Sequence, residues 1–208
     1  MKRVLYPLVI AVTVAAILLL WTQRPPTTVS TVVIHPKTAV KTVLAAGKLT
    51  DRTHLQLFLR ESLADTVKAG QSVLVSGAGL RKSAYAGTVS TVAEAATVQS
   101  GKTGLAAEVL LEESTTDDSV KPGLTATARI TVKIFDNAVT VEDAWLIPEA
   151  ETTAVYVLEN GRAVCRAVTL SEQTDSGYVA AGLFENDHVL IHPETIRAHQ
   201  KIKETPSE

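Results

Sequence analysis

The sequence has a single cysteine, Cys165, and aromatic residues make up only 4% of its 208 positions. One thiol cannot form an internal disulfide or a multi-cysteine zinc site, so the sequence predicts a small buried side chain in a strand. The shortage of aromatics argues against platforms on which nucleic-acid bases stack. A net charge of −2 gives no basic field for phosphate backbones, so no nucleic-acid partner is expected.

Motifs of enzymatic chemistry are also lacking. The sequence has no Walker motif, no GxGxxG and no nucleophile elbow, so we predict no catalytic residue and no cofactor. His188 and His192 flank an apolar run, and on a strand they would lie about 13 Å apart, too far to share one metal ion. We therefore predict no metal site, although the oxygen-rich segment 112–119 leaves calcium as an alternative.

The N-terminus contains the longest apolar run. Residues 4–21 are 18 uncharged residues, about 27 Å as a helix, and Lys2 and Arg3 precede them. We predict a signal anchor over 1–21, single-pass in the cell membrane, with the C-terminal region extracytoplasmic by the positive-inside rule. A cleaved signal peptide is the alternative. Residues 22–28 are predicted to be a linker.

Beyond residue 28, apolar residues recur with a period of two, which is typical of strands with one solvated face. Strands are predicted on this pattern over 29–34, 55–59, 105–111 and 130–134, the last with Ile130, Val132 and Ile134 inward. The fold class is therefore all-β: a small β-barrel over 29–134 and a membrane-proximal β-domain over 135–192, behind the transmembrane helix. The polar tail, 193–208, is expected to fray.

Four glycines are predicted to be structural turn residues. Gly161 follows Asn160 in the dipeptide that most strongly favours a two-residue hairpin turn. Gly123 ends a Lys-Pro-Gly turn, and Gly70 ends one or two helical turns over 61–69. Gly182 is the fourth of these turn positions.

Six segments, in fixed order, resemble the HlyD-type membrane fusion proteins, the periplasmic adaptor subunits of efflux pumps. They include a Lys-x-Gly-Gln-like turn, an aromatic-x-Gly-x-Val strand, a Leu-Lys-Pro-Gly-Met-Thr-Ala-like turn and a closing Val-Tyr-Val with Gly-Leu and Asp-x-Val. The segments are 43–49, 55–73, 85–89, 120–126, 139–146, and 155–157 with 182–183 and 187–189. Glu142 and Asn186 depart from the family pattern, at positions where the family has a proline and a turn glycine.

The resemblance implies a non-enzymatic accessory subunit that contacts the extracytoplasmic face of an inner-membrane transporter permease, of ABC type. Family members carry a lipoyl domain and a coiled-coil hairpin after the first barrel strand, whereas here residues 47–52 lead directly into the next strand. A shortened form is therefore expected, and homo-oligomerisation is left open. The alternative is a membrane-anchored envelope module that binds a small ligand or a cell-wall component.

Overall fold

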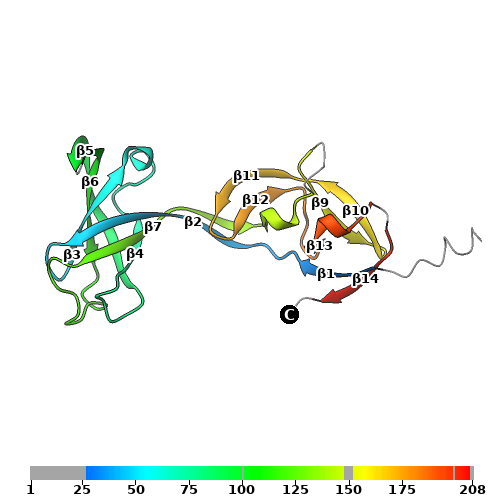
Figure 1. Ribbon diagram of the computed structural model, residues 1–208, viewed down its shortest axis with the longest axis horizontal. Coiled ribbons are helices and arrows are strands. Elements are labelled where there is room, and N and C mark those ends of the chain that lie inside the picture. Colours follow the sequence, from blue (N-terminus) through cyan, green and yellow to red (C-terminus); the bar gives the residue numbers. More distant parts are fainter. Residues whose placement is uncertain (1–26, 100, 148–151, 199, 207–208) are drawn as a thin grey trace, which may run out of the picture. The chain divides into compact units, whose positions relative to one another are not determined.

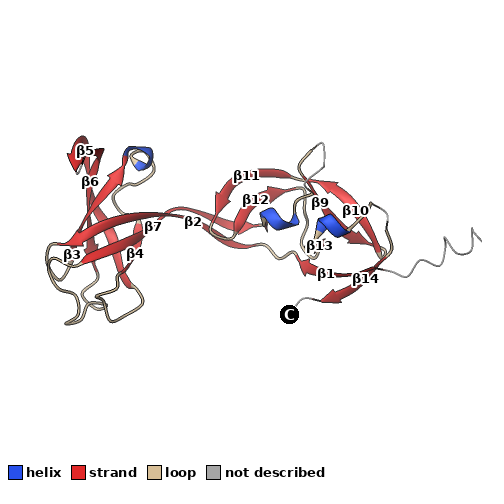
Figure 2. Ribbon diagram, in the orientation of Figure 1, coloured by secondary structure: helices blue, strands red, loops and turns tan. Residues whose placement is uncertain are grey.

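The structure is a computed structural model that describes residues 27–99, 101–147, 152–198 and 200–206. Within these residues it contains 14 strands and three short 3-10 helices, which confirms the all-β prediction (Figure 2). Contacts divide the chain into two units. The barrel unit contains 36–140 and 171–179, and the sheet unit contains the described residues of 1–35, 141–170 and 180–208.

The barrel unit is built on a closed barrel of six strands (Figure 1). Neighbouring strands all pair antiparallel, and closure leaves no strand of the barrel with an open edge. The strand order is β2 (Lys37–Leu49), β3 (His54–Arg60), β6 (Lys102–Leu111), β5 (Tyr85–Gln99), β4 (Ser72–Ser76) and β7 (Thr125–Ala138).

Alternating aliphatic side chains fill the barrel and explain why these segments form strands. In β3, Leu55, Leu57 and Leu59 are 0%, 2% and 0% exposed, while the residues between them face outward or are only partly covered. Val109 of β6 and Ile130 of β7 are fully buried against them in one core cluster. The period-two prediction is confirmed for these strands.

The predicted inward position of Ile134 is wrong, since this side chain is 57% exposed. Between Thr131 and Lys133 of β7 the pairing with β2 slips by one residue, because Thr131 pairs with Thr42 and Lys133 with Lys41. Such a bulge reverses which residues face the core beyond it. The sequence pattern alone does not locate this bulge.

Tyr85 is buried at the start of β5 and joins two loops of the barrel unit. Its hydroxyl donates to Asp117 Oδ2 at 2.9 Å and accepts from the Lys82 amide at 3.2 Å. Asp117 also accepts hydrogen bonds from the Ser119 hydroxyl and amide, the latter at 2.8 Å. These bonds from Ser119, helped by Tyr85 and by the charge of Arg81, lower the Asp117 pKa from 3.8 to about 2.

The sheet unit contains a five-stranded sheet that brings the first described strand beside the last. Its order is β10 (Arg162–Ala167), β9 (Ala154–Glu159), β13 (His188–Leu190), β1 (Thr27–Val33) and β14 (Ile202–Pro206). β1 pairs antiparallel with β13 and parallel with β14, over a small core that includes Val29, Leu190 and Ile202. A further sheet has the order β11 (Thr169–Thr174), β12 (Gly177–Ala181) and β8 (Thr140–Val141).

This pairing changes three details of the predicted organisation. Residues 29–35 lie in the sheet unit and not with the barrel, because β1 pairs with strands from the C-terminal part of the chain. Residues 27 and 28 of the predicted linker begin β1, and residues 202–206 of the tail form β14 instead of fraying. The division therefore differs from the predicted consecutive ranges 29–134 and 135–192.

Residues 171–179 join the barrel unit through polar contacts to β2 and β7. Glu172 forms ion pairs with Lys41, at 3.1 Å, and with Lys133. Asp175 accepts hydrogen bonds from the Thr42 hydroxyl at 2.8 Å and the Thr42 amide at 3.1 Å. The bonds from Lys133 and Lys41 lower the Glu172 pKa, so this carboxylate is charged near neutral pH.

Among the described residues no helix has the length and apolar character needed to cross a membrane. The predicted anchor over 1–21 lies outside these residues, as do residues 22–26 of the predicted linker.

The depressed Asp117 pKa predicts an acid sensitivity of the barrel unit. A carboxylate with a folded pKa of about 2 and an ordinary value of 3.8 stabilises the fold above pH 3.8, and this stabilisation is lost as pH falls toward 2. We expect Asp117→Asn to lower the urea midpoint at pH 7 and to flatten the decline between pH 3.8 and 2. Asp118→Asn is the matched control, because that side chain is 87% exposed. Identical pH profiles for the two variants would contradict the assignment.

Candidate functional site

Groups that could carry chemistry are dispersed over the described residues. No cluster there has three or more histidine, cysteine, aspartate or glutamate side chains arranged to hold a metal ion. In the turn before β3, His54 Nδ1 lies 3.0 Å from Asp51 Oδ1, and Asp51 also accepts from the Thr53 and His54 amides at 2.7 Å. These bonds lower the Asp51 pKa from 3.8 to about 2, and the bond from the Thr53 amide has the largest effect. Asp51 therefore stabilises this turn through its hydrogen bonds.

Cys165 is exposed, and the prediction that it is buried is therefore wrong. It lies in β10, at the edge of the five-stranded sheet, where Ala163 is fully buried but the next residue on the same face is not. Apart from Arg166, residues 163–168 are apolar, which favours a buried strand, but an edge strand is covered only in part.

All four predicted turn glycines lie at positive φ. Asn160 and Gly161, at 49° and 72°, form the predicted two-residue turn between β9 and β10, and Gly70 and Gly182 have φ of 90° and 104°. The predicted helical turns before Gly70 are a 3-10 helix, Glu61–Leu63, followed by a turn.

Gly123 shows why the conformation matters, because its φ is 89° and its amide donates to the Leu49 carbonyl at 2.8 Å. A Cβ at this position would meet only Lys48 Cε, at 3.9 Å, so the constraint is the backbone angle and not space.

Sequence reasoning missed a second group of glycines, inside the barrel strands. A Cβ on Gly47 would lie 2.3 Å from the Gln56 carbonyl oxygen, and one on Gly104 would lie 2.2 Å from that of Leu59. Gly87 has a similar approach, at 2.7 Å, to the Leu110 oxygen. A glycine inside an alternating apolar run is the sequence feature that could have identified these close backbone approaches.

The outer wall of the barrel carries a row of exposed apolar side chains around a cation. Leu44 of β2 and Leu74 of β4 each pair with Arg129 of β7, so the three lie side by side across three strands. Leu44 is 62% exposed and Leu74 is 50% exposed. Arg129 has no ion pair among the described residues. We call this set the outer row. It combines exposed apolar surface with arginine, a residue type that is enriched at protein contact surfaces.

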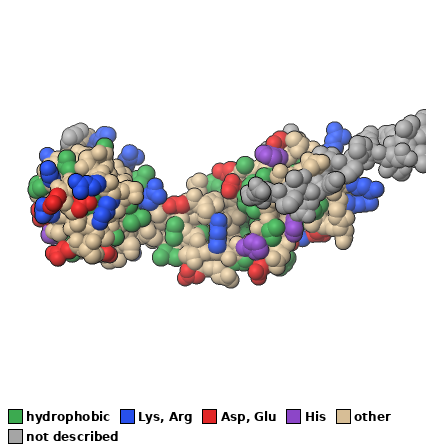
Figure 3. Space-filling view, turned by 90° about the horizontal axis from the view of Figure 1, so that it is seen from below, with side chains coloured by type: hydrophobic (Ala, Val, Ile, Leu, Met, Phe, Trp, Pro, Cys, Tyr) green, Lys and Arg blue, Asp and Glu red, His purple; other side chains and the backbone are tan. Residues whose placement is uncertain are grey.

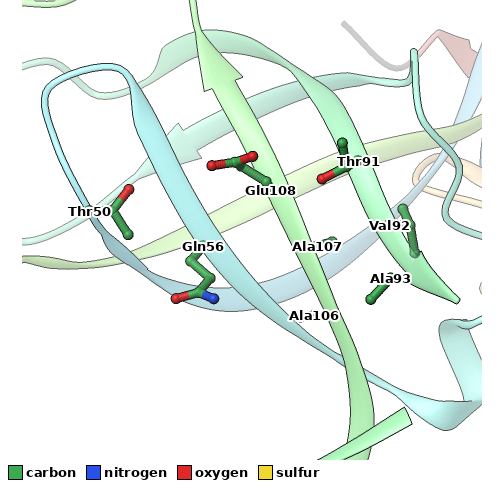
Figure 4. A pocket seen from close by; sticks show the side chains of 8 residues that line it. All are labelled: Thr50, Gln56, Thr91, Val92, Ala93, Ala106, Ala107 and Glu108. Atoms are coloured by element: carbon green, nitrogen blue, oxygen red, sulfur yellow. The ribbon is translucent and has the colours of Figure 1, made fainter. Parts of the chain in front are cut away.

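A hollow of about 320 Å³ lies on another part of the outer wall, over β3, β5 and β6 (Figure 4). Three of its four polar lining residues form one row across the strands, since Glu108 pairs with Gln56 on one side and with Thr91 on the other. Figure 4 shows the Glu108 side chain between those of Gln56 and Thr91. The remaining lining residues are Thr50, Val92, Ala93, Ala106 and Ala107.

Elsewhere on the barrel unit the surface is mixed. On the face seen in Figure 3, basic and acidic side chains are interspersed with hydrophobic ones. This face therefore carries no continuous field of one sign.

Substitution of Gly123 tests the turn. Gly123→Val forces a β-branched residue to positive φ, which we expect to destabilise the protein by about 1–3 kcal/mol in denaturant unfolding. Gly123→Asn is the matched variant, because asparagine tolerates this conformation, and it should cost less. A Gly123→Val protein as stable as the unsubstituted chain would refute the structural role.

Comparison with known proteins places the fold but not the activity. No known family model and no curated protein sequence matches the chain. Among solved structures, MacA from Actinobacillus actinomycetemcomitans matches with a TM-score of 0.54 and 19% identity, over 68% of this chain and 43% of MacA. A MacA–MexA chimera containing the Pseudomonas aeruginosa MexA α-hairpin domain matches at 0.46, with 22% identity, over 68% of this chain and 46% of the chimera. ZneB from Cupriavidus metallidurans matches at 0.33, with 19% identity, over 67% of this chain and 40% of ZneB. The chain thus spans less than half the length of each, and it shares its fold with part of MacA.

Proposed function

We propose that the chain is a shortened HlyD-type membrane fusion protein, a non-enzymatic adaptor subunit of an efflux transporter of ABC type. The observation that carries the proposal is the fold shared with MacA over 68% of the chain, because MacA belongs to the membrane fusion proteins. The six ordered sequence segments that resemble this family support the same assignment independently of the coordinates.

The connection between β2 and β3 supports the shortened form. In the family, the lipoyl and hairpin domains follow the first barrel strand. Here β2 ends at Leu49 and β3 begins at His54, and the turn between them is fastened by Asp51. Such an adaptor would act beside the membrane that holds its transporter, with no coiled-coil hairpin at this position to reach further.

The mechanism we propose is binding and positioning. The interior of the closed barrel is filled with aliphatic side chains, so a partner that contacts the barrel unit must use its outer wall. The outer row supplies two exposed leucines and an arginine that a permease could cover. Burying such side chains is favourable, at about 25 cal/mol per Å² of apolar surface removed from water.

Co-purification tests this assignment. The tagged full chain, extracted in mild detergent from its own cells, should retain a permease, and Leu44→Ser with Leu74→Ser should reduce the amount retained by about tenfold. Val98→Ser is the control, because Val98 is 73% exposed but lies outside the outer row, near the β5–β6 turn. If the double variant still retained the permease but no longer associated with other copies of the chain, the outer row would be assigned to a contact between copies. Recovery of no transporter component would favour the envelope binding module.

Membrane topology provides a separate test. The proposal places the N-terminus in the cytoplasm and all residues after 21 outside the membrane, in line with Lys2 and Arg3. An alkaline phosphatase fusion at the C-terminus should be active, and a β-galactosidase fusion at the same point should not. The reverse pattern would exclude an extracytoplasmic adaptor.

A further inference from the structure

We propose that the hollow over β3, β5 and β6 is a binding site for an organic cation, a guanidinium or alkylammonium group carried on a short apolar stem. The site lies apart from the outer row, and the inference does not rest on the transport assignment. It is carried by the shape of the barrel wall, the isolated carboxylate of Glu108 and the apolar lining around it.

The hollow is formed by the course of β5. Thr91 pairs with Glu108 and Val92 with Ala107, but the next pair is Ala96 with Leu105. Residues 93–95 of β5 therefore stand opposite Ala106 alone, and a bulge of this kind bends a strand away from its partner. Ala93 and Ala106 both line the hollow, and their small side chains leave the volume of about 320 Å³ open.

Glu108 is the one charged group in the lining, and it is half-buried. No ion pair or side-chain hydrogen bond to its carboxylate occurs among the described residues. Lys48 is in the same cross-strand row, next to Gln56, but its Cε lies 3.9 Å from the Cβ position of Gly123 and so is directed to the neighbouring turn. A carboxylate in such surroundings attracts a cation from outside the chain.

The neighbouring groups define which cation fits. The Gln56 carboxamide oxygen and the Thr91 and Thr50 hydroxyls can accept further N–H bonds beside the carboxylate. The partly exposed side chains of Val92, Ala93 and Ala106 offer apolar surface to an alkyl stem, which a bare metal ion could not use. Arginine and lysine side chains and free alkylamines share this combination of a charged head and an apolar stem.

The test uses the full chain in non-ionic detergent and calorimetric titration. We expect n-butylguanidinium and n-butylammonium to bind with dissociation constants on the order of 1 mM, and n-butylurea, the neutral isostere, not to bind. Glu108→Gln should weaken binding of n-butylguanidinium about tenfold. Glu94→Gln is the matched control, because it removes an exposed carboxylate of the same bulge that does not line the hollow. Ala93→Leu should also abolish binding by filling the hollow while leaving Glu108 in place.

N-acetylarginine amide distinguishes two possible sources of the cation, a side chain of a protein partner and a free amine. Tighter binding of this probe than of the alkyl cations assigns the site to a side chain of a protein partner, and weaker binding assigns it to a free amine. The proposal is overturned if none of the cations binds at about 10 mM, if n-butylurea binds equally well, or if Glu108→Gln behaves as Glu94→Gln does. The co-purification experiment tests the adaptor assignment with different variants. Failure of the cation proposal is therefore distinguishable from failure of the adaptor assignment.

Discussion

The pairing of β2 with β7 is the constraint on which the barrel unit depends. These strands are separated by the sequence that forms the other four barrel strands, and they pair from Lys37 with Ala138 to Lys48 with Thr125. Within the same barrel, Gly47 of β2 and Gly104 of β6 permit close approaches to the backbone of β3 that a Cβ would prevent. The bulge in the same pairing turns Ile134 outward and places Lys41 and Lys133 together on Glu172.

Closure also decides where function can reside. The interior is filled by Leu, Val, Ile and Ala side chains, with Tyr85 at the start of β5, so that ligand or partner contact must occur outside. Two features of the outer wall are suited to such contact: the Leu44–Arg129–Leu74 row and the hollow around Glu108. They offer different chemistry, since the row presents apolar surface with a cation and the hollow presents an anion.

Several acidic residues that could be candidates for catalysis or metal binding in the sequence instead stabilise the fold. Asp117, in the acidic segment 112–119, holds the Tyr85 hydroxyl and Ser119, and Asp51 holds the turn that joins β2 directly to β3. Glu172 and Asp175 attach residues 171–179 to the barrel strands. Hydrogen bonds to Asp117, Asp51 and Glu172 lower the pKa values of these carboxyl groups.

Local chemistry in the sequence determined the strand content, the Asn160–Gly161 hairpin and the positive φ at the four turn glycines, because period-two patterns and turn residues act over a few neighbouring positions. Tertiary structure alone decided that β1 joins β13 and β14, that β7 carries a bulge, and that Cys165 is exposed at an edge. The outer row and the hollow also depend on tertiary structure, because strand register makes their residues neighbours. The row joins Leu44, Leu74 and Arg129. The hollow joins Gln56, Thr91 and Glu108.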